Sequence, residues 1–158
     1  MAQFVHLADA RNVAAIRRCG LRGLKPWRVV FAMPVLEDHL LTHQWLRELR
    51  RHRNVPMLAV QFRVPDSELV KVGRFDGIHL DATASQAVAI IRQHEAPFGL
   101  QVIFSRKIKP TEITRIYSPP KIVGWRYWPE SRGAEPCPCA YFQRGLAYSR
   151  RIRQRDLA

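Results

Sequence analysis

The chain has 158 residues, 47% of them hydrophobic and 25% charged, which is the size and composition of one ordinary globular domain. That composition excludes intrinsic disorder, a fibrous repeat and a disulfide-rich miniprotein. Lys and Arg number 26 against 13 Asp and Glu, which gives a formal net charge of +13 and favours a polyanionic partner.

The first elements expected along the chain are a strand, a capped helix and a second strand. Residues 4–7 are apolar and are expected to form a strand. Asp9 is a suitable cap for a helix that Gly20 ends. The second strand is expected over residues 28–33, because Pro34 cannot continue a central ladder.

The middle of the chain combines the clearest helix with alternating strands. Apolar side chains recur three and four residues apart over residues 36–51, which predicts an amphipathic helix. Apolar and polar residues alternate over 58–64, which predicts a half-buried strand, and another strand is expected over 69–72. Thr83 or Ser85 is expected to cap the next helix.

The last third of the chain returns to extended structure. Strands are expected over residues 100–104, 113–117 and 122–128. We therefore predict an α+β domain over residues 1–128. A loop containing Pro and Cys, then a basic helix or tail, is expected over residues 129–158.

The strongest motif lies at the start of the chain. It reads His6-x-Ala8-x-x-x-Asn12, followed by Val and Ile on the expected helix and by the pair Gly20-Leu21. This opening resembles that of the ADP-ribosyltransferase fold, in the branch that contains DarT-type DNA-modifying toxins and RNA 2′-phosphotransferases. Ala8 occupies a position where that branch often has Thr, so one hydroxyl contact to ribose is missing.

Two later segments extend the resemblance. Residues 31–34 are similar to the second strand of that fold, although Val35 replaces the arginine of DarT-like proteins. Residues 98–113 are similar to its last motif, in which Gln101 stands where the family has an acidic residue. The resemblance implies two small packed β-sheets with flanking helices, forming a cleft.

The resemblance also implies a site that takes NAD as its substrate. Gln101 would occupy the catalytic position, where a carboxylate stabilises the oxocarbenium-like cation formed at the ribose. Glutamine keeps a hydrogen bond but loses the charge. The chain is therefore a weakened enzyme, a non-catalytic relative or a form disabled at this position. The residues expected to bind NAD are His6, Asn12, Phe31, Met33, His43 and Trp45.

The implied activity is ADP-ribosyl transfer to a nucleic acid, of a toxin or defence type with an antitoxin or immunity protein as possible partner. The alternatives are a basic nucleic-acid-binding module without activity and a transferase that modifies a protein. RNA 2′-phosphotransfer is disfavoured, because that family's further Arg and His motifs are not found in the sequence.

Clustered arginines indicate where a nucleic acid would bind. One cluster lies at the end of the predicted long helix, and a second lies in the tail at residues 144–155. The alternative is an arginine-rich composition with solvated helix faces. The residues predicted to bind nucleic acid are Arg47, Arg50, Arg51 and Arg53.

Metal, disulfide and membrane features are weak in the sequence. His39 and His43 are four residues apart, but Leu40 occupies the place where the zinc-protease pattern needs Glu, so we expect no metal. Cys137 and Cys139 lack a second pair of ligands, and reduced thiols are expected. No apolar run reaches the roughly 20 residues of a membrane span, and no secretion signal is seen, so we expect a cytoplasmic protein.

Overall fold

The computed structural model describes residues 1–119 apart from residues 24–25, 27, 38 and 53–54. The strand expected over 122–128 and the tail expected over 129–158 lie outside the described residues. The described elements are β1 (Ala2–Asp9), η1 (Ala10–Asn12), α1 (Val13–Cys19), β2 (Val30–Pro34), α2 (Leu40–His52), β3 (Met57–Val64), β4 (Leu69–Arg74), β5 (His79–Thr83), α3 (Ala84–Gln93), β6 (Leu100–Phe104), η2 (Pro110–Glu112) and β7 (Ile113–Tyr117).

The strands form one antiparallel sheet of seven strands, in the order β5-β4-β6-β2-β1-β3-β7. This confirms the α+β class. The prediction of two separate packed sheets is wrong, because the strands form one continuous sheet. Pairing between β1 and β2 joins its two halves, which are β5-β4-β6-β2 and β1-β3-β7. That joint is short and contains the partner pairs Phe4–Pro34 and Val5–Met33.

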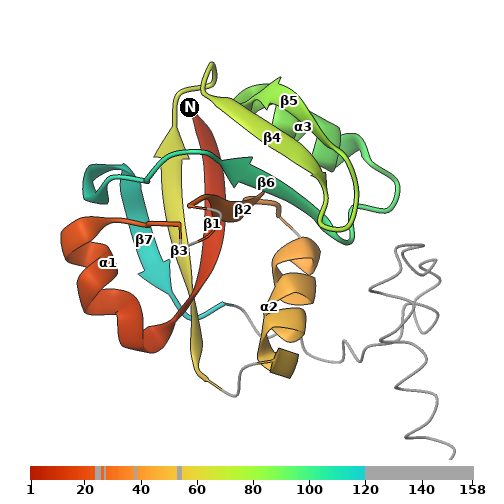
Figure 1. The fold of residues 1–158 in the computed structure, drawn as a ribbon. Coiled ribbons are helices and arrows are strands. Elements are labelled where there is room, and N and C mark those ends of the chain that lie inside the picture. The colour runs from red at the N-terminus through yellow and green to blue at the C-terminus, as the bar shows by residue number, and fades with distance from the viewer. Residues whose placement is uncertain (24–25, 27, 38, 53–54, 120–158) are drawn as a thin grey trace, which may run out of the picture.

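An aromatic core explains how the sheet curls on itself. The ring of Phe104, on β6, lies 5.0 Å from the ring of Phe4 on β1, although β2 separates the two strands in the sheet. It also lies 5.3 Å from the ring of Phe62 on β3. All three side chains are fully buried. The two halves of the sheet cross in Figure 1. We call the face that carries these rings the inner face of the sheet.

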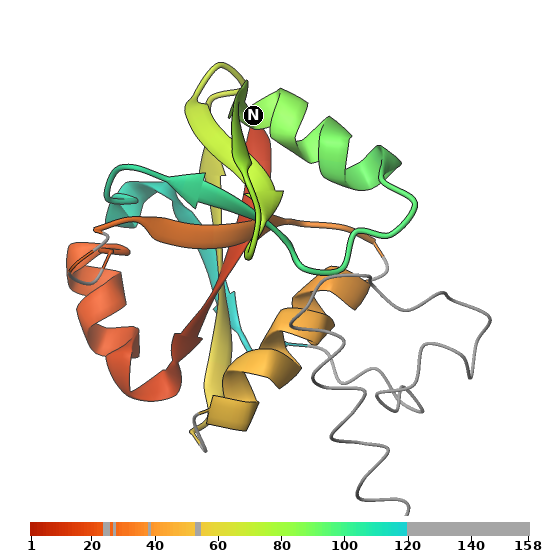
Figure 2. The same cartoon turned by 45° about the vertical axis from the view of Figure 1, so that its right-hand side comes forward.

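The helices cover different parts of this sheet. In Figures 1 and 2, α1 and α2 lie on opposite sides of β1 and β3, and α3 lies beside β4 and β5. Two hydrogen bonds hold α2 against the start of β6. The Trp45 indole donates to the Leu100 carbonyl at 2.9 Å, and the Gly99 N–H donates to the Gln44 side chain at 3.1 Å.

Helix ends follow the predicted capping chemistry in two places. Thr83 caps α3 in a reciprocal capping box with Gln86, as its residue type predicts. Gly20 ends α1 with φ of 77°, and a side chain there would collide with the Ile108 carbonyl. Asp9, in contrast, caps the short η1 turn rather than α1 itself.

Two elements differ from the sequence expectation. The long helix begins at Leu40 rather than at residue 36, because His39 has φ of 54°, which no right-handed helix accommodates. Strand β5 was not expected, since only one of its five residues is buried and no apolar alternation marks it. It pairs with β4 around Asp76-Gly77, a dipeptide that favours a hairpin.

An ion-pair cluster near the end of the sheet predicts acid sensitivity. Arg106 binds both carboxylate oxygens of Glu112, at 2.7 and 2.9 Å, and Glu68 at 2.6 Å. The hydrogen bonds from Arg106 hold the pKa of Glu112 below its usual range. Because the folded-state pKa is lowered, the ionised Glu112 stabilises the fold at neutral pH, and that stabilisation is lost as the pH falls below about 4.

We therefore expect Glu112→Gln to lower the free energy of unfolding at pH 7 and to have a smaller effect at pH 3. Urea denaturation at the two pH values measures the difference. Glu95→Gln, at an exposed position, is the control and should show no such change. An equal effect of Glu112→Gln at both pH values would contradict the assignment.

Candidate functional site

The candidate site is built around Gln101 and His79, whose side chains meet across a glycine. Gly73 on β4 pairs with Gln101 on β6 and with His79 on β5, so the three residues form one row across three strands. The Gln101 amide nitrogen lies 3.2 Å from Nε2 of His79. An amide nitrogen donates, so the His79 ring nitrogen accepts this bond.

Gly73 is required for this meeting. A Cβ built at residue 73 would lie 3.2 Å from Cδ2 of His79 and 2.5 Å from the Ile78 carbonyl oxygen. A larger residue would therefore push the imidazole away from Gln101. The pair is largely withdrawn from solvent, because Gln101 is 8% exposed and His79 is half-buried.

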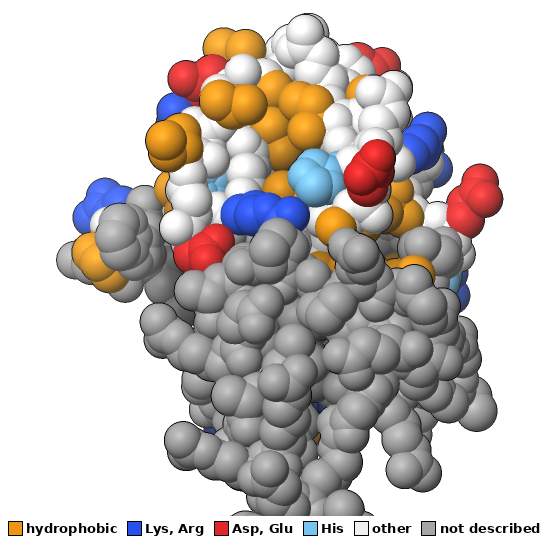
Figure 3. Space-filling view, turned by 90° about the vertical axis from the view of Figure 1, so that its right-hand side faces the viewer, with side chains coloured by type: hydrophobic (Ala, Val, Ile, Leu, Met, Phe, Trp, Pro, Cys, Tyr) orange, Lys and Arg blue, Asp and Glu red, His pale blue; other side chains and the backbone are white. Residues whose placement is uncertain are grey.

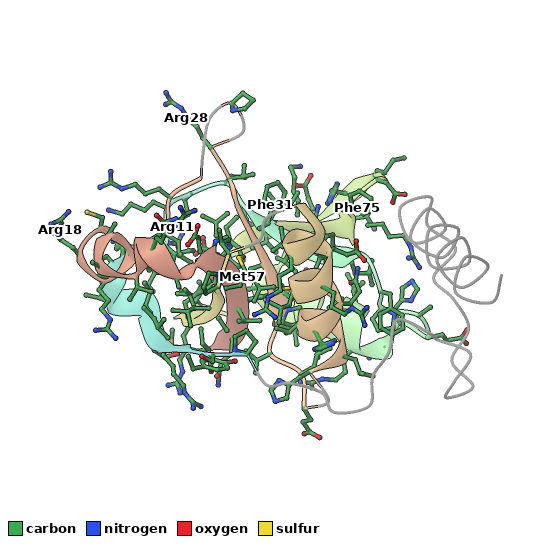
Figure 4. The ribbon with its side chains drawn as sticks, turned by 90° about the horizontal axis from the view of Figure 1, so that it is seen from below. Arg11, Arg18, Arg28, Phe31, Met57 and Phe75 are labelled. Carbon is green, nitrogen blue, oxygen red and sulfur yellow. The ribbon has the colours of Figure 1, made fainter. Side chains whose placement is uncertain are left out.

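Aromatic side chains surround this end of β6. Trp45 binds the Leu100 carbonyl next to Gln101, and its ring lies edge-on to the Phe75 ring, with centroids 5.8 Å apart. The Phe75 N–H donates to the Gly99 carbonyl at 3.0 Å. In Figure 4, Phe75 and Phe31 lie in the region of α2, away from α1. Phe31 is 42% exposed and offers an aromatic surface to a ligand.

Three of the predicted site residues share one face of the sheet. Val30 pairs with Phe104, so Phe31 and Met33 alternate with inner-face residues and lie on the outer face. Gln101 alternates with Val102 and lies on the same outer face of the neighbouring strand. The register thus brings Phe31, Met33 and Gln101 together. Met33 is buried, whereas Phe31 is exposed.

His6 lies on the other face. It follows Phe4 by two residues in an unbroken register with β3, so it belongs to the inner face. Its Nδ1 lies 2.7 Å from the Phe31 carbonyl oxygen, and that nitrogen donates because a carbonyl only accepts. Burial lowers the pKa of His6, which favours the neutral ring. His6 therefore contacts the backbone of Phe31 and does not share a face with Gln101.

Two other predicted residues lie on η1 and α2. Asn12 is exposed in η1 and its side chain forms no capping bond to α1. His43 is half-buried on α2. Two surface hollows are also elsewhere. One of about 320 Å³ is lined by Met1, Gln3, Asp66 and Arg92 among others, and one of about 230 Å³ lies between α1 and β7.

The arginines predicted to bind nucleic acid are only partly described. Arg50 is exposed on α2, and Arg47 is half-buried and has an interaction partner. The side chains of Arg51 and Arg53 lie outside the described residues. Arg50 is thus the one of the four that the described structure places fully at the surface.

Sequence reasoning missed His79 and a second group of cations. The Asp76-Gly77 dipeptide between two short apolar runs was a usable hairpin signal, and it places His79 opposite Gly73. The second group surrounds Cys19, where the hydrogen bond from Arg18 and the charges of Arg22 and Lys107 lower the pKa of the thiol. Arg18, Cys19 and Arg22 are close in sequence, but Lys107 is distant from them, so no local pattern marks the complete group.

The Cys19 thiol is expected to be unusually reactive. A lowered pKa increases the thiolate fraction at pH 7, so alkylation by iodoacetamide should be faster than that of free cysteine. A Cys137→Ser/Cys139→Ser background leaves Cys19 as the sole thiol. Salt should slow the reaction by screening the cations, and Arg22→Gln should slow it too, whereas Arg92→Gln, at an exposed position on α3, should not. A rate independent of salt and of Arg22 would contradict this prediction.

Comparison with protein-family models, with curated proteins and with solved structures gives no match to this chain. Within the described ranges, no group of three or more His, Cys, Asp or Glu side chains is placed to hold a metal ion. None of the described helices has the length and apolar character needed to cross a membrane.

Proposed function

We propose that this chain has an ADP-ribosyltransferase fold, with Gln101 at the position of the catalytic carboxylate and with nucleic acid as its acceptor. The supporting observation is the placement of Gln101 on the outer face of β6, beside Phe31 and Met33 of β2 and bonded to His79. The opening motif at His6 and the segment 31–34 add the family resemblance.

The groups around Gln101 fit the chemistry of the nicotinamide end of NAD. Amide and imidazole groups bind ribose hydroxyls, and an exposed aromatic ring such as Phe31 packs against nicotinamide. NAD would supply the ADP-ribosyl group. The bond between ribose C1′ and nicotinamide breaks, nicotinamide leaves with the electron pair, and C1′ bonds to an acceptor atom that loses its proton to water.

Under this proposal, the predicted residues have different tasks. Gln101 supplies a hydrogen bond without charge, so the transferase activity of this chain is weak or absent. His6 is a positioning residue, since its ring bonds the carbonyl of Phe31 from the inner face. Trp45 and Phe75 form the wall next to Gln101 through their bonds to Leu100 and Gly99.

Nicotinamide release from NAD tests this proposal. The chain and its Gln101→Glu variant are each incubated with NAD and with DNA, RNA or no acceptor. Turnover in the Glu form is the expected result, and its dependence on the acceptor identifies the substrate. A folded Glu form without any turnover would overturn the transferase proposal.

A non-enzymatic nucleic-acid-binding module is the second candidate. The observation that favours it is the closed hydrogen bond between Gln101 and His79, which provides no charge to a reacting cation. In that case, binding to DNA or RNA would depend steeply on salt and would not respond to NAD.

A further inference from the structure

We propose that the surface around α1 is the site where this protein binds the phosphate backbone of a nucleic acid strand. The proposal rests on the proposed function only for the role of that strand as acceptor. The α1 basic surface consists of Arg17, Arg18, Arg22, Lys107 and Arg115, all of which are exposed.

Backbone pairing brings these cations together from three parts of the chain. Leu21 and Ile108 exchange two backbone hydrogen bonds, of 2.9 and 3.0 Å, which places Arg22 beside Lys107. The thiol of Cys19 is close enough to Arg18, Arg22 and Lys107 to respond to all three charges. Arg17 and Arg115 line the same hollow of about 230 Å³ between α1 and β7. The surface therefore extends along α1 to β7.

The positive charge of this surface is not neutralised by its neighbours. Asp9 is bound by Arg11 at 2.6 Å, and Glu112 and Glu68 are bound by Arg106. The ion pairs among the described residues include none of the five cations of the α1 basic surface. Figure 4 shows Arg11 and Arg18 at this end of the molecule, away from Phe31 and Phe75.

The chemistry of the surface favours a nucleic acid over a membrane. Four of its five cations are arginines, whose guanidinium groups form paired hydrogen bonds with phosphate oxygens. A membrane surface would also need exposed apolar side chains, which insert beneath the headgroups. The large exposed hydrophobic residues of the described chain lie elsewhere, at Met1, Phe31, Leu69, Ile78, Leu80 and Ile90.

Figure 3 shows the side of the molecule that faces away from α1. Hydrophobic side chains gather there in the described part of the surface, and basic side chains are few. The apolar positions Leu69, Ile78 and Leu80 belong to β4, β5 and the turn between them. These exposed apolar side chains and the α1 basic surface thus lie on different sides of the molecule. The α1 basic surface is therefore suited to contacts with a phosphate backbone that do not involve these apolar side chains.

The salt dependence of binding tests this inference. Binding of a fluorescein-labelled 20-nucleotide DNA strand is followed by anisotropy between 50 and 500 mM NaCl, without NAD. In the variant Arg17→Gln/Arg22→Gln/Lys107→Gln, three lost phosphate contacts should reduce the slope of log K against log salt by about 2. Across this tenfold range of salt, the Kd of the variant should then change about a hundredfold less than that of the parent.

A control variant removes exposed cations elsewhere. The variant Lys71→Gln/Arg92→Gln takes two exposed cations from β4 and α3 and should leave the slope unchanged. Equal slopes for the triple variant and this control would overturn the inference. The inference would also be overturned if the Arg17→Gln/Arg22→Gln/Lys107→Gln variant lost binding only to phosphatidylserine vesicles, because the surface would then bind a membrane. Circular dichroism and thermal melting verify that both variants fold.

Cys19 gives a second readout at the surface itself. In the Cys137→Ser/Cys139→Ser background, the bound strand should slow alkylation of Cys19, and unchanged alkylation at saturating strand would overturn the inference. Because neither measurement contains NAD, the α1 basic surface is tested separately from catalysis. A chain that binds strands in this way and never releases nicotinamide would support this inference and contradict the proposed function.

Discussion

Nicotinamide release by the Gln101→Glu variant is expected to exceed that of the parent chain by about 10²–10³. Glutamate and glutamine have the same shape, so the variant adds a charge without changing the packing of β6. A carboxylate at this position would stabilise the cation that forms at ribose C1′ as nicotinamide leaves. The expected increase appears in turnover and not in the stability of the fold.

The structure indicates how the new carboxylate would be held. Nε2 of His79 lies 3.2 Å from the Gln101 side-chain nitrogen and accepts its hydrogen bond. In the Glu form, the ring would instead donate from Nε2 to a carboxylate oxygen. The double variant Gln101→Glu/His79→Ala removes that donor and should release less nicotinamide than Gln101→Glu alone.

A control variant separates position from charge. Ile103→Glu adds a carboxylate on the same strand and face, two residues from Gln101. It should show no gain in nicotinamide release, because the charge is then one step away along β6. Equal turnover in Gln101→Glu and Ile103→Glu would show that the site does not depend on residue 101, which would contradict its catalytic assignment.

The largest expected loss of stability follows from truncation of Phe104. We expect Phe104→Ala to lower the free energy of unfolding by about 3–5 kcal/mol. Phe104 is fully buried, and its ring contacts the rings of Phe4 and Phe62. The truncation would remove the contact that holds the β6 half of the sheet on β1 and β3, and it would leave a cavity there.

Urea denaturation followed by tryptophan fluorescence measures this loss. A typical domain has a free energy of unfolding of about 5–15 kcal/mol, so the variant would retain a reduced but measurable transition. Leu69→Ala is the control, since Leu69 is 79% exposed, and it should change the stability by about 0.5 kcal/mol or less. Similar losses in the two variants would show that the aromatic cluster does not hold the halves together.

The local elements of this protein could be predicted from its sequence because their signals are local. Thr83 with Gln86 defines the start of α3, and Gly20 defines the end of α1. Alternation of apolar residues predicted β3 and β6. The start of α2 was the exception, because the positive φ of His39 does not follow from the periodicity of the residues after it.

The predicted residues of the candidate site were placed less well. The sequence indicated Gln101, Phe31 and Met33 as members of one site, and the register of β2 and β6 puts them on one face. His6 was assigned to the same site, yet its register with β3 places it on the inner face. The face of the sheet on which a side chain lies depends on the register of its strand with the neighbouring strands. Residues nearby in the sequence do not specify that register.

The sequence by itself determined the α+β class, most elements and the excess of positive charge, since these depend on composition and on spacing within one element. The tertiary structure decided which residues lie opposite each other on neighbouring strands and segments. Pairing around Gly73 brought His79 to Gln101, and the bridge between Leu21 and Ile108 gathered the cations of the α1 basic surface. These contacts join residues distant in the chain, and their formation depends on strand register and on packing of the whole sheet.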